Sequence, residues 1–320
     1  MSGRTMLVTG ATGVVGAELL DRATAAGWDA VGCSASGGAG VVAWNIGAEP
    51  APEELRRPWS VIVHAAARPD FELTVEEAYA ANVAPLLALP PLLAGGTHLV
   101  HVSSVYATGY RGSVESTDPA DYRNGYEWSK ACAEREAAAR FGSVTVVRPP
   151  IVIGRRGDGA VARFSALYLL VRGVCDGTIP AVAGDPDGLV ELVSTCDVAR
   201  CVLAAAAGPR PDGVALHVLG QGADAPTLAT VLGRATRALN RWRAERGVRA
   251  MSRPPLVPPE AGAGPLMGAF VPYLREHTAV PVTWRVDPIE ECLDASVRWW
   301  AQRHPEITLR AVAPWEELVG

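Results

Sequence analysis

The chain has 320 residues, of which 49% are hydrophobic and 20% are charged, and its formal net charge at pH 7 is −5. This length is enough for one large domain or two modest ones with a filled core, and the composition is that of an ordinary globular protein. The negative charge argues against a general nucleic-acid binder, and no stretch approaches the ~20 consecutive apolar residues of a membrane span.

The first half of the sequence alternates between strand-like and helix-like segments. The expected elements, in chain order, are strand 5–9, helix 14–26, strand 30–34, strand 60–64, helix 75–93, strand 98–103, helix 126–140 and strand 143–148. Strands separated by helices predict βαβ units with right-handed crossovers. The predicted fold class is therefore α/β, a doubly wound parallel sheet covered by helices on both faces.

Beyond Ile153 the pattern becomes less regular, and prolines interrupt it, most densely at 254–259. We expect residues 1–153, with returning segments at about 190–220, to form a dinucleotide-binding domain. We expect residues 154–189 and 221–320 to form a smaller substrate-binding cap over the carboxyl edge of the sheet.

The cysteines and histidines, six of each, give no sign of a disulfide framework or a metal site. No two cysteines form a Cys-x-x-Cys pair, and the histidines lack the spacing of metal ligands. Scattered cysteines are typical of reduced, mostly buried thiols. With no signal-peptide pattern at the start of the sequence, they predict a cytoplasmic protein without a metal.

A glycine-rich turn, TGATGVVG at 9–16, follows the first expected strand and precedes a helix. Its first glycine would permit a tight turn, the second would let the backbone approach a pyrophosphate, and the third would let helix and strand pack closely. The helix N-terminus then offers N–H groups and the positive end of its dipole to phosphates. The residues predicted to bind the dinucleotide here are Thr9, Gly10, Thr12, Gly13, Val14, Val15 and Gly16.

The end of the second expected strand bears on the choice of dinucleotide. It reads GCSASGG at 32–38, without the Asp or Glu that would hydrogen-bond an NAD ribose and without an Arg for a 2′-phosphate. The hydroxyls of Ser34 and Ser36 can serve either cofactor. The missing carboxylate favours NADPH and leaves NADH as the alternative. Asn45 and Ile46, after a third short strand, are expected near the adenine.

Tyr126 and Lys130 are four residues apart in NGYEWSKACAERE, at 124–136, so that a helix places both on one face. An ammonium beside the phenol would lower the tyrosine pKa from about 10 and allow proton exchange with a carbonyl oxygen during hydride transfer. The alternative is an ordinary surface pair. Lys130 is the only lysine in the chain, and the larger guanidinium of arginine would replace it poorly beside a ribose.

Two serines end the strand expected at 98–103, in HVSSVYATG at 101–109. A hydroxyl at this point can hydrogen-bond a substrate carbonyl and help to stabilise an oxyanion. Turn formation is the alternative explanation for a Ser-Ser pair at a strand end.

These motifs together resemble the extended short-chain dehydrogenase/reductase superfamily. The matching segments, in the order of the family, are TGATGVVG at 9–16, HAAA at 64–67, Asn82 in AANVA, VSSVYATG at 102–109, YEWSK at 126–130 and VVRPPIVIG at 146–154. The resemblance implies a Rossmann fold and an NAD(P)-dependent oxidoreductase. It also allows a homodimer in which the helices near 75–93 and 126–140 form a four-helix bundle.

The resemblance further implies roles for single residues. Ser104, Tyr126 and Lys130 would be the catalytic triad, with Ser104 preferred over Ser103. Asn82 would support a proton relay or the fourth helix. Tyr126 and Lys130 would also contact the cofactor, as would His64, Ala65, Ala66, Ala67, Asn82, Pro149 and Ile151. The substrate would lie against Ser104, Val105, Tyr106 and Tyr126.

Within the superfamily, several segments look most like the thioester-reductase and fatty-acyl-reductase branch. They are NGYEWSKACAERE, VTVVRPPIVIGRRGDG at 144–159, FSALYLLVRGV at 164–174 and FVPYL at 270–274. Enzymes of that branch reduce an acyl thioester carried by CoA or a carrier protein. Glu127 stands where nucleotide-sugar epimerases usually have glycine, and Val105-Tyr106 excludes sugar 4,6-dehydration.

The predicted function is therefore NADPH- or NADH-dependent reduction of an acyl thioester, or of the aldehyde derived from it, with an acyl carrier protein as a candidate partner. A nucleotide-sugar epimerase or ketoreductase with the same triad is the alternative. A third hypothesis is a non-catalytic dinucleotide sensor, which would not need the Tyr126–Lys130 pair.

A second amphipathic segment lies in the C-terminal half. Its apolar stripe at helical spacing consists of Leu228, Leu232, Ala235, Leu239 and Trp242, and residues 234–253 contain seven arginines and one glutamate. The plain interpretation is a helix with a solvated basic face. The sharper one is a docking surface for an acidic carrier protein or a CoA phosphate.

Overall fold

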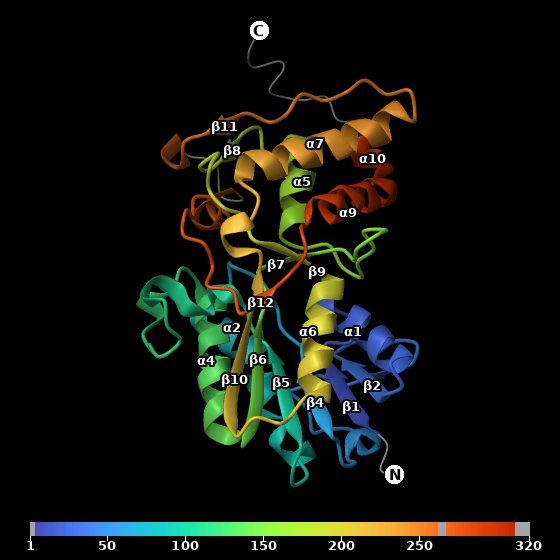
Figure 1. The fold of residues 1–320 in the computed structure, drawn as a ribbon, viewed down its shortest axis with the longest axis vertical. Coiled ribbons are helices and arrows are strands. Elements are labelled where there is room, and N and C mark those ends of the chain that lie inside the picture. The colour runs from blue at the N-terminus through green and yellow to red at the C-terminus, as the bar shows by residue number, and fades with distance from the viewer. Residues whose placement is uncertain (1–3, 262–266, 311–320) are drawn as a thin grey trace. The chain divides into compact units, whose positions relative to one another are not determined.

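The computed structural model describes residues 4–261 and 267–310. The chain divides into two compact units (Figure 1). The first unit consists of Met1–Pro150 and Cys196–Leu219, and the second of Ile151–Thr195 and Gly220–Gly320. The segment 190–195, which the sequence analysis grouped with the dinucleotide-binding domain, thus lies in the second unit.

The first unit is built on a parallel sheet. Its strands are β1 (Thr5–Thr9), β2 (Asp29–Ser34), β3 (Val41–Ala43), β4 (Val61–His64), β5 (His98–Val102), β6 (Ser143–Arg148) and β10 (Gly213–Gly220). They are hydrogen-bonded in the order β10-β6-β5-β4-β1-β2-β3, and the pairs along this series are parallel. The chain moves outward on one side of β1 and then returns to the other side with β4. This order is that of a doubly wound sheet, so the predicted fold class is confirmed.

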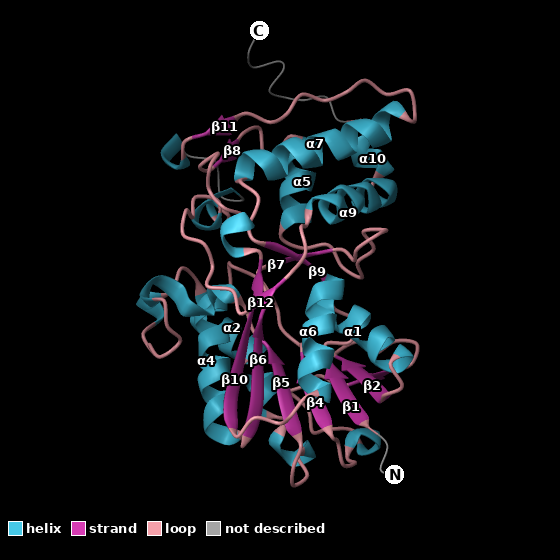
Figure 2. Cartoon of the chain, viewed as in Figure 1, coloured by secondary structure: helices cyan, strands magenta, loops and turns pink. Residues whose placement is uncertain are grey.

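Helices cover both faces of this sheet (Figures 1 and 2). In the first unit they are α1 (Val14–Ala25), α2 (Val75–Asn82), α3 (Ala84–Leu87), α4 (Gly125–Arg140) and α6, which begins at Thr195 and ends at Ala207. Figure 1 shows α2 and α4 on one face and α1 and α6 on the other. The strands are apolar on both sides, as parallel sheets require: the register partners Leu7 and Ile62 on one face are fully buried, and so are Val8 and Val63 on the other.

The helix expected over 75–93 is broken. It begins with a capping box between Thr74 and Glu77 and ends at Asn82, and it is followed by the short α3 and a 3₁₀ turn at Pro90–Leu92. Three prolines, at positions 85, 90 and 91, explain the breaks, because proline has no N–H to donate and its ring clashes with the preceding turn. The expectation of one continuous helix was wrong.

The second unit has its own apolar core. Its helices are α5 (Leu167–Asp176), α7 (Leu228–Ala244), α9 (Glu290–Arg303) and α10 (Pro305–Thr308). Its strands are β7 (Ile151–Ile153), which pairs with β9 (Leu192–Ser194), then β8 (Val182–Ala183), which pairs with β11 (Leu256–Val257), and β12 (Trp284–Arg285). The stripe predicted from the sequence, Leu228 to Trp242, lies on α7 and is buried in this core.

Ion pairs bind α7 to α9 and use part of the arginine-rich face. Arg234 and Arg241 both donate to Asp294, at 3.2 and 2.7 Å, and the buried Arg243 donates to the carbonyl of Arg249. Arg237 is exposed, and no acidic side chain among the described residues pairs with it. Within the described residues, every helix is too short or too polar to traverse a lipid bilayer.

Candidate active site

The carboxyl ends of the central strands gather the predicted site residues at one edge of the sheet. Register pairs Thr9 of β1 with His64 of β4, and His64 with His101 of β5. The strand order reverses between β1 and β4, and crevices at such switch points are where open α/β sheets bind ligands.

The glycine turn after β1 has the close contacts that a dinucleotide loop needs. Gly10 has φ +67°, and a Cβ there would lie 2.7 Å from the Ala66 Cα. A Cβ on Gly16 would lie 2.2 Å from the carbonyl oxygen of Gly10, so helix α1 can pack on the turn only with glycine at this position. Gly13 caps α1 without a side-chain hydrogen bond, and the first turn has no acidic residue. The residues present therefore fit a bound pyrophosphate.

The residues predicted to surround the adenosine half differ in exposure. Ser34 is buried, and its hydroxyl donates to the Gly37 carbonyl at 3.4 Å within the turn. Ser36 and Asn45 are exposed, and Ile46 is half-buried. Of the two candidate serines, Ser36 is the one whose hydroxyl is open to a ligand.

A buried pair of histidines lies between the glycine turn and the predicted catalytic residues. The Thr9 hydroxyl lies 2.9 Å from the His64 Nδ1 and accepts a hydrogen bond from the Ala66 N–H, which fixes the start of the segment after β4. The His64 and His101 rings stack with centroids 5.5 Å apart. Burial, helped by the charge of Lys130, lowers the pKa of His64 to about 3 and holds the pKa of His101 well below its usual value. Both imidazoles are therefore neutral at neutral pH.

The structure brings Ser104, Tyr126 and Lys130 into one buried network. Helix α4 presents Tyr126 and Lys130 on one face. The Ser104 hydroxyl hydrogen-bonds the Tyr126 side chain, and the Lys130 Nζ donates to the Val102 carbonyl at 2.8 Å. Ser104 also caps the 3₁₀ segment Val105–Arg111 by accepting from the Tyr106 N–H, so its turn role and its contact with Tyr126 coexist.

The effect that the sequence analysis assigned to Lys130, a lowered tyrosine pKa, was wrong for this structure. Burial raises the pKa of Tyr126 to about 12, the hydrogen bond from Ser104 opposes that rise, and the Glu127 carboxylate adds to it. Burial also lowers the pKa of Lys130 to about 8, against the carboxylate of Glu134. The ammonium is directed to the Val102 carbonyl, and desolvation outweighs its influence on the phenol.

Ser103 has a different partner from Ser104. Its hydroxyl donates to the Glu134 Oε1 at 2.5 Å, and Glu134 also receives two hydrogen bonds from Arg148 at the end of β6. Of the two serines, Ser104 is the one that contacts Tyr126, and its catalytic role stays a prediction. Glu134 and Arg148 were not predicted from the sequence. The one available signal was that Glu134 follows Lys130 by four residues, as Lys130 follows Tyr126.

Asn82 has a positioning role in this structure. It is fully buried, its Oδ1 accepts from the Arg68 N–H at 2.7 Å, and its Nδ2 donates to the Ser129 hydroxyl at 2.9 Å. Ser129 in turn donates to the Tyr126 carbonyl at 2.8 Å. The amide is therefore used within the protein, where it connects the segment after β4 to the first turn of α4.

Glu127, the residue beside the predicted catalytic tyrosine, is fully buried. Its backbone N–H donates to the Asn124 side chain that caps α4, and its carboxylate accepts from the Arg123 N–H at 3.1 Å and guanidinium at 3.3 Å. The carboxylate thereby anchors the start of the helix that presents Tyr126.

The remaining predicted contacts fall in both units. Val105 and Tyr106 are half-buried, and the Val105 N–H donates to the Pro149 carbonyl at 3.1 Å. Ala65 and Ala66 are half-buried and Ala67 is exposed. Ile151 belongs to β7 of the second unit. Among the described residues, no three His, Cys, Asp or Glu side chains gather as metal ligands would.

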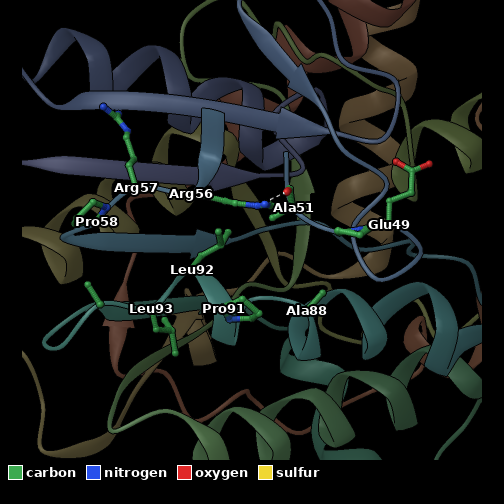
Figure 3. Close-up of a pocket in the computed structure, with 11 residues that line it drawn as sticks. Glu49, Ala51, Arg56, Arg57, Pro58, Ala88, Pro91, Leu92 and Leu93 are labelled. Carbon is green, nitrogen blue, oxygen red and sulfur yellow. Dashed lines mark hydrogen bonds between the residues drawn. The ribbon is translucent and has the colours of Figure 1, made fainter. Parts of the chain in front are cut away.

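A pocket of about 550 Å³ lies elsewhere in the first unit (Figure 3). Its lining comes from the segments 49–58 and 88–94, which precede β4 and β5, so it lies toward the amino edge of the sheet. Figure 3 shows Pro91 and Leu92 on one side and the Arg56 side chain extended to the Ala51 carbonyl, 2.8 Å away. None of the predicted site residues lines it.

Comparison with known proteins shows similarity to an NAD-binding family and to solved structures of one fold. Residues 48–202, a little under half of the chain, match the model of an NAD-binding family described as male sterility protein. This match supports the predictions of the extended short-chain dehydrogenase/reductase superfamily, of an oxidoreductase and of a nicotinamide dinucleotide as cofactor. No curated protein matches its sequence.

Solved structures of the same fold extend the comparison over nearly the whole length of the chain. MoeE5 in complex with UDP-glucose and NAD has a TM-score of 0.67 and 21% identity, over 93% of this chain and 99% of that one. The terminal R domain from the myxalamid PKS-NRPS pathway has a TM-score of 0.69 and 20% identity, over 97% and 93%. UDP-glucose 4-epimerase from Bifidobacterium longum, in complex with NAD+ and UDP, has a TM-score of 0.63 and 17% identity, over 94% and 99%.

The glycine turn yields a prediction for cofactor binding. Gly16→Ala would push a Cβ against the Gly10 carbonyl and displace the turn, so we expect the dissociation constants of NADPH and NADH to rise at least about tenfold. Fluorescence titration of the reduced cofactors measures them. Gly142→Ala is the matched control, because a Cβ there meets nothing within 4 Å. Equal affinity in the two variants would refute the close-packed turn.

The buried histidines yield a prediction for stability. Because their pKa values are lowered in the folded state, the unfolded chain binds more protons below pH ~6.5, and the free energy of unfolding falls as the pH drops. Each histidine should contribute a loss of about 2 kcal/mol between pH 7 and pH 5. Urea denaturation at both pH values should show a correspondingly smaller loss for His101→Leu.

The matched control is Val100→Ala, because Val100 is also fully buried and its truncation should lower the free energy of unfolding equally at pH 7 and pH 5. If His101→Leu loses as much as the wild type, the native imidazole of His101 is already protonated at pH 5.

Proposed function

We propose that the protein is an NAD(P)H-dependent reductase of a carbonyl substrate, and that the substrate is an acyl thioester or the aldehyde derived from it. The observation that carries the proposal is the buried contact of Ser104 with Tyr126, beside Lys130, at the carboxyl edge of a sheet that also holds the glycine turn. The thioester is favoured by the match of residues 48–202, which include the Tyr-x-x-x-Lys segment, and by the likeness to a polyketide–peptide terminal reductase domain.

In the proposed mechanism, the reduced nicotinamide supplies a hydride to the carbonyl carbon when it is bound. Tyr126, whose high pKa keeps its proton on the phenol, donates that proton to the carbonyl oxygen as negative charge develops there. The Ser104 hydroxyl orients the same oxygen. Lys130 holds the ribose and returns a proton to the phenolate, which its pKa of about 8 permits near neutral pH.

For a thioester, this first step gives a hemithioacetal. Its carbon–sulfur bond then breaks, the hydroxyl proton moves to the sulfur by way of Tyr126, and an aldehyde and a thiol leave. Each acyl group thus consumes one hydride and one proton up to the aldehyde. NADPH is the proposed cofactor, because the end of β2 carries no carboxylate to repel a 2′-phosphate.

The second candidate is a nucleotide-sugar epimerase or ketoreductase with the same three residues. The likeness to MoeE5 and to UDP-glucose 4-epimerase favours it, since both are solved with NAD and, respectively, UDP-glucose and UDP. The buried Glu127 beside Tyr126 is the local feature that favours the reductase over the epimerase. The homodimer and the cytoplasmic location stay predictions.

The test is oxidation of NADPH and NADH, followed at 340 nm with acyl-CoA, aldehyde and sugar-nucleotide panels. We expect thioesters or aldehydes to turn over, whereas turnover of sugar nucleotides alone would refute the thioester.

Tyr126→Phe should lower kcat about 10²- to 10⁴-fold, because it removes the proton donor. Lys130→Arg should lower kcat far more than it lowers stability. The exposed Tyr79 supplies the control, since Tyr79→Phe should leave kcat unchanged.

The exposed arginine of α7 offers a test for a carrier-protein partner. We propose that Arg237 contributes to docking of an acidic carrier, since Arg241 is already paired with Asp294. Arg237→Glu should raise KM for a carrier-bound substrate about three- to tenfold at low salt, as expected for a reversed surface charge. The same variant should leave KM for a small thioester unchanged. Arg210→Glu, in the exposed loop before β10, is the control. An unchanged carrier KM in Arg237→Glu would exclude Arg237 from docking.

A further inference from the structure

A buried carboxylate lies one helical turn beyond the predicted catalytic lysine. Glu134 follows Lys130 on the same face of α4 and is 6% exposed. Its Oε1 accepts from the Ser103 hydroxyl at 2.5 Å and from the Arg148 Nε at 2.9 Å, and its Oε2 accepts from the Arg148 Nη2 at 2.6 Å. A forked guanidinium–carboxylate pair of this kind fixes both side chains in one geometry.

Three consecutive residues at the end of β5 are each bound by a different side chain of α4. The Val102 carbonyl accepts from Lys130, the Ser103 hydroxyl donates to Glu134, and the Ser104 hydroxyl contacts Tyr126. The middle contact, through Glu134, is also the one that reaches β6, because Arg148 is the last residue of that strand. Glu134 therefore joins the strand that carries Ser104 to the helix that carries Tyr126 and Lys130.

The charges around the lysine give Glu134 an electrostatic role as well. His64 and His101 interact with Lys130 from β4 and β5, and both are neutral. On α4, Tyr126 keeps its proton. Glu127 also lies on α4, three residues before Lys130, but its carboxylate is paired with Arg123. The carboxylate that acts on Lys130 is that of Glu134, which Arg148 binds. Burial disfavours the Lys130 ammonium, and the carboxylate of Glu134 is what opposes that effect.

We propose that Glu134 is a positioning residue for the Ser104–Tyr126–Lys130 network, whose carboxylate holds Lys130 in its charged form and fixes the end of β5 against α4. Arg148 sets how much of that negative charge reaches Lys130. This role rests on the proposed function, in which Lys130 returns a proton to the Tyr126 phenolate. The test of the role needs no substrate.

The test uses the fact that Lys130 is the only lysine of the chain. Protein labelled with lysine carrying ¹³C at Cε gives one lysine signal, and its chemical shift against pH reports the titration of Lys130 directly. The wild-type midpoint is expected at about 8. Glu134→Gln keeps the size of the side chain and removes its charge, so the midpoint should fall by about one pH unit. Arg148→Gln removes the neutralising cation, so the midpoint should rise.

Opposite shifts in these two variants are what a structural role alone would not produce. Glu134→Asp keeps the charge and Ser103→Ala removes only one hydrogen bond, so both should titrate close to the wild type. An unchanged midpoint in Glu134→Gln overturns the proposal, and so does a midpoint that moves in the same direction in Glu134→Gln and Arg148→Gln. If Glu134→Gln does not fold, the direction of the shift in Arg148→Gln decides.

A kinetic arm separates this proposal from the proposed function. With a reducible carbonyl substrate, the alkaline fall of kcat should begin at lower pH in Glu134→Gln by the same shift as the lysine signal. If the wild type reduces no carbonyl substrate while the lysine signal shifts as expected, the proposed function fails and the positioning of Lys130 by Glu134 stands.

Discussion

The first unit depends on the burial of one ammonium group. Lys130 is 2% exposed, and an ion withdrawn from water into a protein interior is destabilised by several kcal/mol unless other groups replace its hydration. Here the replacements are the Val102 carbonyl, directly bound, and the carboxylate of Glu134 one turn away. Burial, helped by the same cation, keeps the neighbouring His64 and His101 neutral. The end of β5 and the face of α4 thus accommodate one buried charge, which also adds to the neutrality of the two histidines.

The features that could be predicted from sequence are those set by local geometry. The spacing of Tyr126 and Lys130 needs only a helix, and the glycines at 10, 13 and 16 need only a strand, a turn and a helix in succession. The parallel strands followed from uninterrupted apolar runs such as Val61–His64. These local rules position the glycine turn and the paired tyrosine and lysine correctly without any knowledge of the tertiary structure.

What could not be predicted depends on contacts between distant segments. Glu134 meets Ser103 and Arg148 across 31 and 14 residues of sequence, and only the packing of α4 against β5 and β6 brings them together. The sign of the Tyr126 pKa shift was mistaken for the same reason, because burial of the phenol is a tertiary property that outweighs a neighbour four residues away. The break in the helix after Asn82 is a different case, because Pro85 was a local signal from which it could have been predicted.

The environment of Tyr126 bears on the direction of the chemistry. Reduction of a carbonyl needs a phenol that still holds its proton, whereas oxidation of an alcohol, the first step of an epimerase, needs a phenolate. Tyr126 holds its proton firmly, because burial raises its pKa and the fully buried Glu127 carboxylate beside it adds to that rise. A glycine in place of Glu127 would remove that negative charge and favour the phenolate. Glu127, which replaces the glycine of the epimerase pattern, therefore raises the pKa of Tyr126, and this pKa decides whether the tyrosine acts as a proton donor or as a proton acceptor.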